Sequence, residues 1–303
     1  MVPKIMKQGR LAPLIYLGPA LFIMLIFIIY PTFNTVWLSF RDKTGTQSAA
    51  ASCQAGQPCW GAFENYRYAL TNQAMLLALR NNALWLLLMV PGVVAVGLLF
   101  ALLTDRVSYE PIAKSLVFMP MAISFIGAGV IWRFVYYIEA GGGAQIGLLN
   151  GILVKLGLQP VAFISDPRIN NFALMFVGVW LWAGFCMTIL SAAIKGLPTE
   201  VIEASRVDGA NEWNVFWQVM FPMILPTIVV VTTTMVINVL KIFDIVFVMT
   251  GGNFGTEVIA NRMFQLIVTD TGKSMSIAVL LIILTIPVMV FNIRRFRAEE
   301  ANR

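Results

Sequence analysis

The sequence contains no histidine and only three cysteines among its 303 residues. Histidine is the commonest general base near neutral pH and a frequent metal ligand. Its absence argues against a hydrolytic centre, and we expect neither a metal site nor a cofactor bound by this chain. Charged residues make up only 12% of the chain, whereas soluble domains contain about 25%. The composition therefore leaves no room for a large soluble domain.

Long apolar runs replace the missing charge, and 59% of the residues are hydrophobic. A helix needs about 20 mostly apolar residues to cross a bilayer. The runs predict an all-α integral membrane protein with six transmembrane helices at 11–40, 82–104, 115–138, 171–194, 226–250 and 274–293. Residues 1–40 would form the N-terminus and first span, 41–80 an extracytoplasmic loop, and 81–303 a five-helix core.

The basic residues predict the orientation in the membrane. The net charge is +6, and the cations cluster at the ends of the apolar runs. This distribution is better explained by membrane topology than by a nucleic-acid partner, and we expect lipid rather than nucleic acid around the chain. An even number of spans places both termini on one side. The cluster Arg294, Arg295 and Arg297, directly after an apolar run, predicts that this side is the cytoplasm.

The segment 196–222 interrupts the apolar pattern with charge, small residues and aromatics. Pro198 is typical of a first helical turn, and Gly209 would break this helix. A second helix would end at Pro222 and place four side chains on one face: Trp213, Phe216, Trp217 and Met220. The pattern indicates a cytoplasmic docking surface for another protein, although an ordinary interfacial loop with an aromatic anchor fits equally well.

A family resemblance favours the docking surface. The chain has Glu203-Ala204-Ser205, three residues, Gly209, nine residues and then Val219-Met220-Phe221-Pro222. This spacing resembles the Glu-Ala-Ala motif of permease subunits of binding-protein-dependent ABC importers. The stretches "FENYRYAL", "FMPMAISFIGAGVIWRF" and "FDIVFVMTGG" resemble maltose-type (type I) carbohydrate permeases. The sequence "GGNFGTEVIANRMF" is most similar to the α-glucoside subgroup.

The resemblance implies a type I importer permease with a cytoplasmic coupling helix, in a bacterial or archaeal inner membrane. Its partners would be a second homologous permease, two ATPase subunits that bind ATP and Mg²⁺, and an extracytoplasmic sugar-binding protein. The chain itself would be non-catalytic. Its "TGKS" is not a phosphate loop, because Ile267 stands where the first glycine is required. The resemblance assigns ATPase coupling to Glu203, Ala204, Ser205, Arg206, Asp208 and Gly209.

Two charged residues inside the fifth run are candidates for the substrate pathway, because ionisable groups in a span are costly. Lys241 and Asp244 stand three residues apart, so they would share one helix face, with Asn238 one turn before. They could bind sugar hydroxyls or form a structural ion pair. In the fourth run, Gly184 and Phe185 resemble a sugar-contacting stretch, where the small Gly184 could admit a sugar ring. Their neighbours Trp182 and Met187 would line the pathway, although aromatic residues there could equally be packing.

Two other expectations remain open at this stage. Cys53 and Cys59 flank one polar loop and could form a disulfide outside the cytoplasm, or stay as free thiols. The chain could also be a secondary sugar transporter driven by an ion gradient, with Lys241 and Asp244 as coupling charges. A membrane enzyme is a further alternative, which the lack of a clustered polar site disfavours.

Overall fold

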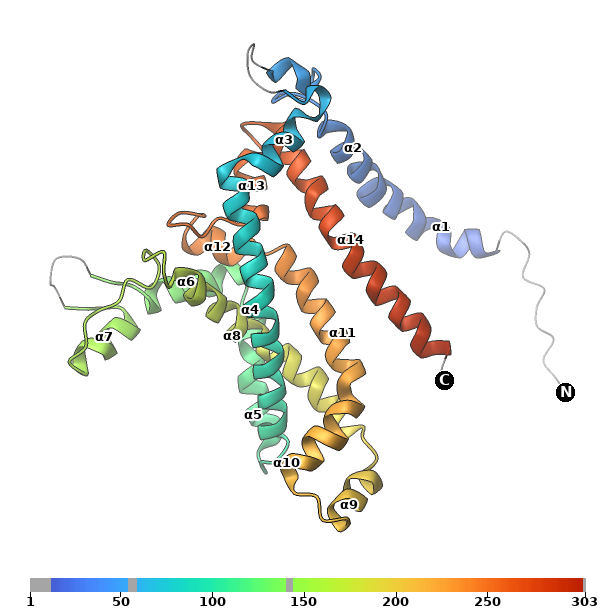
Figure 1. Cartoon of the computed structure of the whole chain (residues 1–303), viewed down its shortest axis with the longest axis vertical. Coiled ribbons are helices and arrows are strands. Elements are labelled where there is room, and N and C mark those ends of the chain that lie inside the picture. Colours follow the sequence, from blue (N-terminus) through green and yellow to red (C-terminus); the bar gives the residue numbers. More distant parts are fainter. Residues whose placement is uncertain (1–11, 54–58, 140–143, 302–303) are drawn as a thin grey trace. The chain divides into compact units, whose positions relative to one another are not determined.

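The computed structural model describes residues 12–53, 59–139 and 144–301, and this part of the chain is helical (Figure 1). Within it there is no β-strand, only an isolated bridge between Arg41 and Ser48. The chain divides into two compact units. Unit 1 comprises residues 1–70 and 265–280, and unit 2 comprises residues 71–264 and 281–303.

Unit 1 begins with an apolar helical stretch made of α1 (Ala12–Met24), the π-helical turn η1 (Leu25–Ile29) and α2 (Tyr30–Leu38). Its segment Tyr16–Leu38 is long and apolar enough to cross a membrane, and none of it is buried inside the protein. The predicted first span is therefore present as a helix. Its predicted start at Leu11, and the basic N-terminus before it, lie outside the described residues.

A polar loop follows, with the 3₁₀ turns η2 (Ala49–Ser52) and η3 (Gly61–Phe63) and the helix α3 (Glu64–Thr71). The buried amide of Asn65 holds this loop together. It donates to the carbonyl oxygens of Ser39 at 2.9 Å and Arg41 at 2.6 Å. Ser276, in the first part of α14 (Thr271–Ala301), donates to the Asn65 carbonyl at 3.2 Å. One asparagine therefore joins three segments of unit 1.

Unit 2 is built on two long helices, α4 (Gln73–Thr104) and α8 (Asn170–Lys195), which pack along each other with α11 (Phe221–Leu240) beside them (Figure 1). A Cβ added at Gly97 would lie 2.4 Å from the Cβ of Cys186, so glycine permits this close approach. The core between the helices includes Trp85, Met89, Leu174, Leu181, Met187, Leu190 and Met235.

The second span starts earlier than predicted. α4 begins at Gln73 rather than at residue 82, because Asn72 accepts a hydrogen bond from the backbone N–H of Ala74 at 3.0 Å and caps the helix. Residues 73–80, which the sequence assigned to the loop, therefore form the first turns of α4.

The third predicted span is not one straight helix. It consists of α5 (Glu110–Phe118), the 3₁₀ turn η4 (Met119–Ala122) and α6 (Phe125–Val135), bent by 99°. Pro120 lies at this bend, and Ser124 caps the new helix by accepting from the Gly127 N–H at 3.0 Å. The described residues contain five helices fit to span a membrane, or six if the bent pair is one span. The prediction of six is met only in this second sense.

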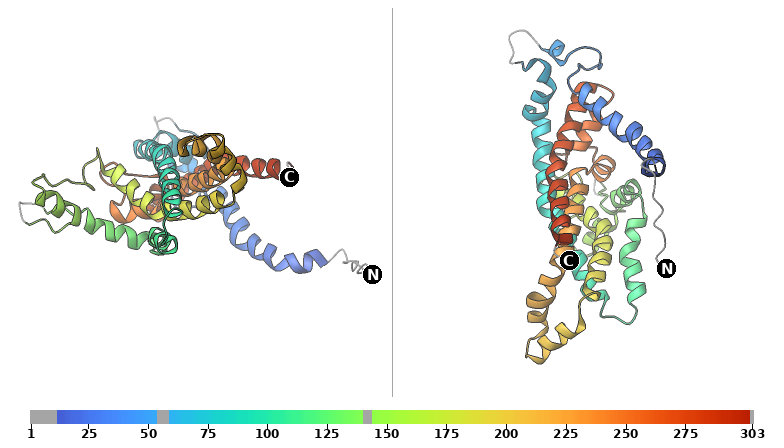
Figure 2. Two further views of the ribbon diagram at one scale, coloured as in Figure 1. Left: turned by 90° about the horizontal axis from the view of Figure 1, so that it is seen from below. Right: turned by 90° about the vertical axis from the view of Figure 1, so that its right-hand side faces the viewer.

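The remaining short helices are α7 (Leu148–Lys155), α9 (Thr199–Val207), α10 (Glu212–Asn214), α12 (Asp244–Met249) and α13 (Ile259–Leu266). α7 is the short helix in the loop that follows the bent pair. α9 and α10 form a hairpin at one end of unit 2 and project beyond the corner between α4 and α5 (Figures 1 and 2).

Candidate functional site

The hairpin of α9 and α10 has the form that the sequence predicted for a docking segment. Pro198 is the N-cap of α9, and none of the helix's residues is buried. Gly209 follows with a φ of +88°, a conformation that glycine adopts without strain. The helix ends where the sequence indicated, and two of its apolar residues, Val201 and Val207, are 43% and 87% exposed.

The six predicted coupling residues lie together on this segment. Ser205 is half-buried and donates to the Ile202 carbonyl at 2.7 Å. The other five are exposed: Glu203, Ala204, Arg206, Asp208 and Gly209. Arg206 is held by Glu212 of α10, which raises the pKa of its guanidinium above the ordinary value. The segment is therefore accessible, and the Arg206–Glu212 pair stabilises its turn.

The second helix of the segment does not end at Pro222, as the sequence predicted. α10 continues through the π-helical turn η5 (Val215–Met220) into α11, so that Glu212–Leu240 is one continuous helix. Pro222 lies in the first turn of α11, and the widened π-turn precedes it. Three of the predicted aromatic residues do gather on this helix, joined by Phe221: Trp213, Phe216 and Trp217.

The fifth span is interrupted at the predicted charges. α11 ends at Leu240, Lys241 is its C-cap, and Asp244 begins α12. The prediction that Lys241 and Asp244 share one helix face is therefore wrong, and in the described structure the two form no ion pair. Non-helical backbone at membrane depth persists only where it is buried in protein or lines a cavity.

A cavity does lie at this interruption. Its volume is 110 Å³, and it brings together four of the predicted pathway residues, Trp182, Asn238, Lys241 and Asp244, with Phe125 of α6. Trp182 stacks on Phe125 with ring centroids 5.6 Å apart. A flat aromatic surface beside an amide, an ammonium and a carboxylate can contact one face and the hydroxyl groups of a small polar molecule.

The other pathway residues occupy different positions. Phe185 packs edge-on against Trp182, with ring centroids 5.8 Å apart. Met187 is fully buried in the core of unit 2. A Cβ at Gly184 would lie 2.5 Å from the Val117 carbonyl oxygen. The small size of Gly184 thus admits the backbone of α5, and the idea that it admits a sugar ring is not supported.

Sequence reasoning missed two asparagines that organise the interruption. Asn82 donates to the Leu240 carbonyl at 3.3 Å and accepts from the Ile259 N–H at 2.9 Å. Asn81 donates to the carbonyls of Gly255 and Glu257 at 2.7 and 2.8 Å. Both therefore satisfy backbone groups that the interruption and the following turn leave without helical partners. A pair of amides at the start of an apolar run was the signal that could have revealed them.

A second missed feature is a group of five polar side chains where α4, α5 and α8 meet at the docking end of unit 2. We call it the corner cluster, and it comprises Asp105, Glu110, Lys114, Ser191 and Lys195. Its members come from two stretches of sequence, 105–114 and 191–195, and Lys114 and Ser191 are 77 residues apart, so spacing alone does not indicate that they meet.

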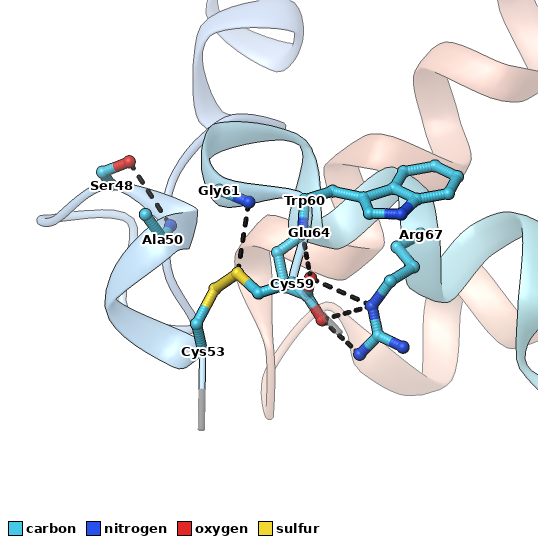
Figure 3. The surroundings of a disulfide bond; sticks show 8 residues. All are labelled: Ser48, Ala50, Cys53, Cys59, Trp60, Gly61, Glu64 and Arg67. Carbon is cyan, nitrogen blue, oxygen red and sulfur yellow. Dashed lines mark hydrogen bonds and ion pairs between the residues drawn. A yellow bond between two sulfur atoms is a disulfide. The ribbon is translucent and has the colours of Figure 1, made fainter. Parts of the chain in front are cut away.

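Cys53 and Cys59 form a disulfide in unit 1 (Figure 3). Beside it, the Glu64 carboxylate accepts from the Trp60 N–H at 3.1 Å and pairs with Arg67. The hydrogen bond from Arg67 holds the pKa of Glu64 below its ordinary value. Since both sulfurs are bonded to each other, neither offers a thiolate to a metal.

A family model described as "Binding-protein-dependent transport system inner membrane component" matches residues 11–296. The chain belongs to this family. It is 51% identical over 290 residues to the osmoprotective compounds uptake permease protein GgtC of Synechocystis sp., covering 95% of this chain and 100% of that protein. It is 44% identical over 295 residues to the alpha-glucoside transport system permease protein AglF of Rhizobium meliloti, covering 96% and 84%.

The fold matches a solved importer as well. A bacterial ABC transporter involved in the import of the acidic polysaccharide alginate aligns with a TM-score of 0.76 at 20% identity, covering 93% of this chain and 94% of that one. The resemblance to ABC importer permeases is confirmed, including its likeness to an α-glucoside permease. The chain is a multi-pass, non-catalytic membrane component of a transport system that depends on a binding protein. Neither a secondary transporter nor a membrane enzyme fits this family.

Proposed function

We propose that this permease forms half of the pathway of an ATP-driven importer for α-glucoside-like sugars. The similarity to AglF over nearly the whole chain supports this substrate class. The interrupted fifth span supports the role, because its cavity offers an aromatic surface and hydrogen-bonding groups to an uncharged polar molecule. The other half of the pathway is a second, homologous permease.

The ATPase docks on the hairpin of α9 and α10. In this proposal each of two ATPase subunits receives one such hairpin, one from each permease, and the ATPase chains hold ATP and Mg²⁺. The observation that carries the proposal is that α9 has no buried residue and, with the turn that follows it, bears the motif Glu203 to Gly209 at the tip of unit 2. Glu203 contacts the rim of the receiving cleft, and Ala204 permits close approach.

The orientation follows from the same assignment. If α9 is cytoplasmic, both termini are cytoplasmic, and the loop that contains Cys53 and Cys59 lies outside, where disulfides persist. An extracytoplasmic binding protein would then deliver the sugar to that face. ATP-driven closure of the motor would change the access of the cavity from one side to the other, as alternating access requires.

The test is gentle extraction of the tagged chain from its own membrane, followed by mass spectrometry of its partners. We expect a second permease and an ATPase to co-purify. Glu203→Lys should lower the amount of ATPase that co-purifies while retaining the second permease, because the substitution reverses a charge on the exposed face of α9 and leaves only the hairpin of the second permease to hold an ATPase. Lys155→Glu reverses an exposed charge on α7 and should retain both. A chain that emerges alone, or an ATPase bound equally by all three proteins, would refute the docking assignment.

A further inference from the structure

The corner cluster connects three helices through one ammonium group. The Nζ atom of Lys114 lies 2.6 Å from Asp105 Oδ1 and 2.6 Å from Glu110 Oε1, and it also contacts Ser191. Ser191 donates in turn to Asp105 at 2.7 Å, and Lys195 pairs with Glu110. Asp105 is the C-cap of α4, and Glu110 and Lys114 lie in the first two turns of α5. Ser191 and Lys195 lie in the last turns of α8.

This cluster differs from an ordinary surface ion pair. Ser191 is buried, and the side chains of Asp105 and Lys114 are only 13% and 22% exposed. Isolated exposed pairs contribute little, whereas truncating one member of a shielded network leaves its partners without compensation. Lys114 and Lys195 both reach Asp105 and Glu110, but Lys195 lies 4.0 Å from Asp105 and is half exposed, whereas Lys114 is shielded and lies 2.6 Å from both carboxylates. The charge of Lys114 is therefore the stronger connection among the three helices.

The cluster is linked to the docking hairpin by two routes. The first is covalent, because Lys195 is the last residue of α8 and only a short turn separates it from α9. The second is ionic. Arg106, next to Asp105, lies 3.9 Å from Glu212, and Glu212 holds Arg206 of α9. A displacement of α9 therefore acts on the end of α8 through the chain and on the α4–α5 turn through the ion pairs.

The other end of α5 leads to the cavity. The backbone of Val117 and Phe118 packs against Gly184 of α8 with no space for a side chain. Directly beyond the bend, Phe125 forms the cavity wall together with Trp182. A helix fixed to α8 at its first turn and again at its last turn cannot slide along α8 independently.

We propose that the corner cluster, with Lys114 at its centre, is a positioning element that makes α5 move as one body with α8 and the docking hairpin. The displacement imposed on α9 then reaches the cavity wall at Phe125. This inference rests on the proposed docking of an ATPase at α9. It assigns Lys114 a role in transmission, distinct from the role of the motif residues in docking.

The experiment uses the intact importer, purified through a tag on this chain, with spin labels at two introduced cysteines. Leu116 on the exposed side of α5 and Gln218 on the helix that follows the hairpin are suitable sites. Cys186 is buried and the other two native cysteines are bonded to each other. The distance between the labels is measured without nucleotide and with ATP under non-hydrolysing conditions.

In the unmodified background we expect one narrow distance distribution that ATP does not change. In Lys114→Met, which keeps the chain length and removes the charge, ATP should broaden or shift it. Lys114→Arg should restore the narrow distribution, and Lys155→Met on α7 should have no effect. Glu110→Gln, which weakens the same contacts while keeping the side-chain size, provides a second variant if Lys114→Met does not assemble. A merely structural role would alter the distance equally with and without ATP.

Two results would overturn the inference: an ATP-dependent distance in the unmodified background, or an unchanged narrow distribution in both Lys114→Met and Glu110→Gln. Neither result touches the proposed docking, which is read separately from the ATPase that co-purifies and its hydrolysis of ATP. Loss of that ATPase from the unmodified chain would instead refute the proposed function.

Discussion

The guanidinium of Arg206 binds the carboxylate of Glu212 through two hydrogen bonds, at 2.8 and 3.2 Å, across the turn at Gly209. This pair joins the two arms of the hairpin, which helps to give α9 a defined orientation. Both side chains are about half exposed, and a solvent-exposed ion pair of this kind contributes little to stability. The backbone conformation at Gly209 must therefore supply much of the hairpin's definition.

We expect Gly209→Ala to weaken ATPase docking. A Cβ there would meet nothing within 4 Å, but the φ of +88° is strained for any residue other than glycine, at a cost of roughly 1–2 kcal/mol. Gly157→Ala is the matched control, since Gly157 has a φ of +77° and equal space outside the hairpin. The measurement is the amount of ATPase that co-purifies. Equal losses in both variants would show a general strain effect rather than a docking effect.

Replacing Asp244 by Asn should impair sugar uptake more than basal ATP hydrolysis in the assembled importer. The carboxylate lines the cavity, and a hydrogen bond to a charged group contributes about 1.5–3 kcal/mol, which corresponds to an increase in KM of roughly ten-fold or more. Uptake and hydrolysis are measured in the same proteoliposomes, with Asp166→Asn as a control in the loop before α8. If both activities fall together, Asp244 has a structural role instead.

Gly184→Ala should lower the thermal stability of the purified chain, with any effect on sugar affinity secondary. The added methyl group would enter the backbone of Val117 and Phe118, and overpacking typically costs about 1–3 kcal/mol. Gly92→Ala on α4 serves as the comparison, because its Cβ would make only an ordinary contact at 3.6 Å with Val179. An unchanged melting temperature together with a changed KM for the sugar would instead indicate that Gly184 lines the substrate pathway.

Acid should loosen the loop near the disulfide. Arg67 holds the pKa of Glu64 below its ordinary value of 4.5. A group whose folded-state pKa is lowered stabilises the fold above its unfolded value, and this contribution is lost as the pH falls through the folded value. Hydrogen exchange of residues 60–70, corrected for its intrinsic pH dependence, should therefore accelerate below pH 4.5. In Glu64→Gln the loop should be less protected throughout, without this acid-dependent step; an identical acid response in both proteins would exclude Glu64 as its source.

The sequence predicted helix ends correctly where proline or glycine stands among polar residues. It failed to predict them where an apolar run continues across a break. Pro198 and Gly209 delimited α9, and the structure has the helix between them. The interruption near Lys241 was hidden, because residues on both sides are apolar and the run reads as one helix. The Asn82 amide that satisfies the Leu240 carbonyl stands 158 residues away in sequence. Such a long-range partner cannot be recognised from local patterns.

Similarly, the sequence named Lys241 and Asp244 as pathway candidates along with Trp182 and Asn238, and the four line one cavity. The geometry that it assigned to the two charges was wrong. Charge spacing within an assumed helix predicts a shared face, and the actual break changes the direction of the chain between them. Gly184 was singled out as a position that could admit a sugar ring. In the structure its small size permits the close approach of the α5 backbone instead, a long-range contact that local patterns do not reveal.

The break at Leu240 has an electrical consequence. A helix carries roughly half a positive charge at its N-terminus and half a negative charge at its C-terminus. Lys241 stands at the negative end of α11 and Asp244 at the positive end of α12, so each charge is stabilised by the dipole of its own helix. The cavity therefore has a fixed polarity with no net charge, which suits a molecule with many hydroxyl groups and no charge of its own.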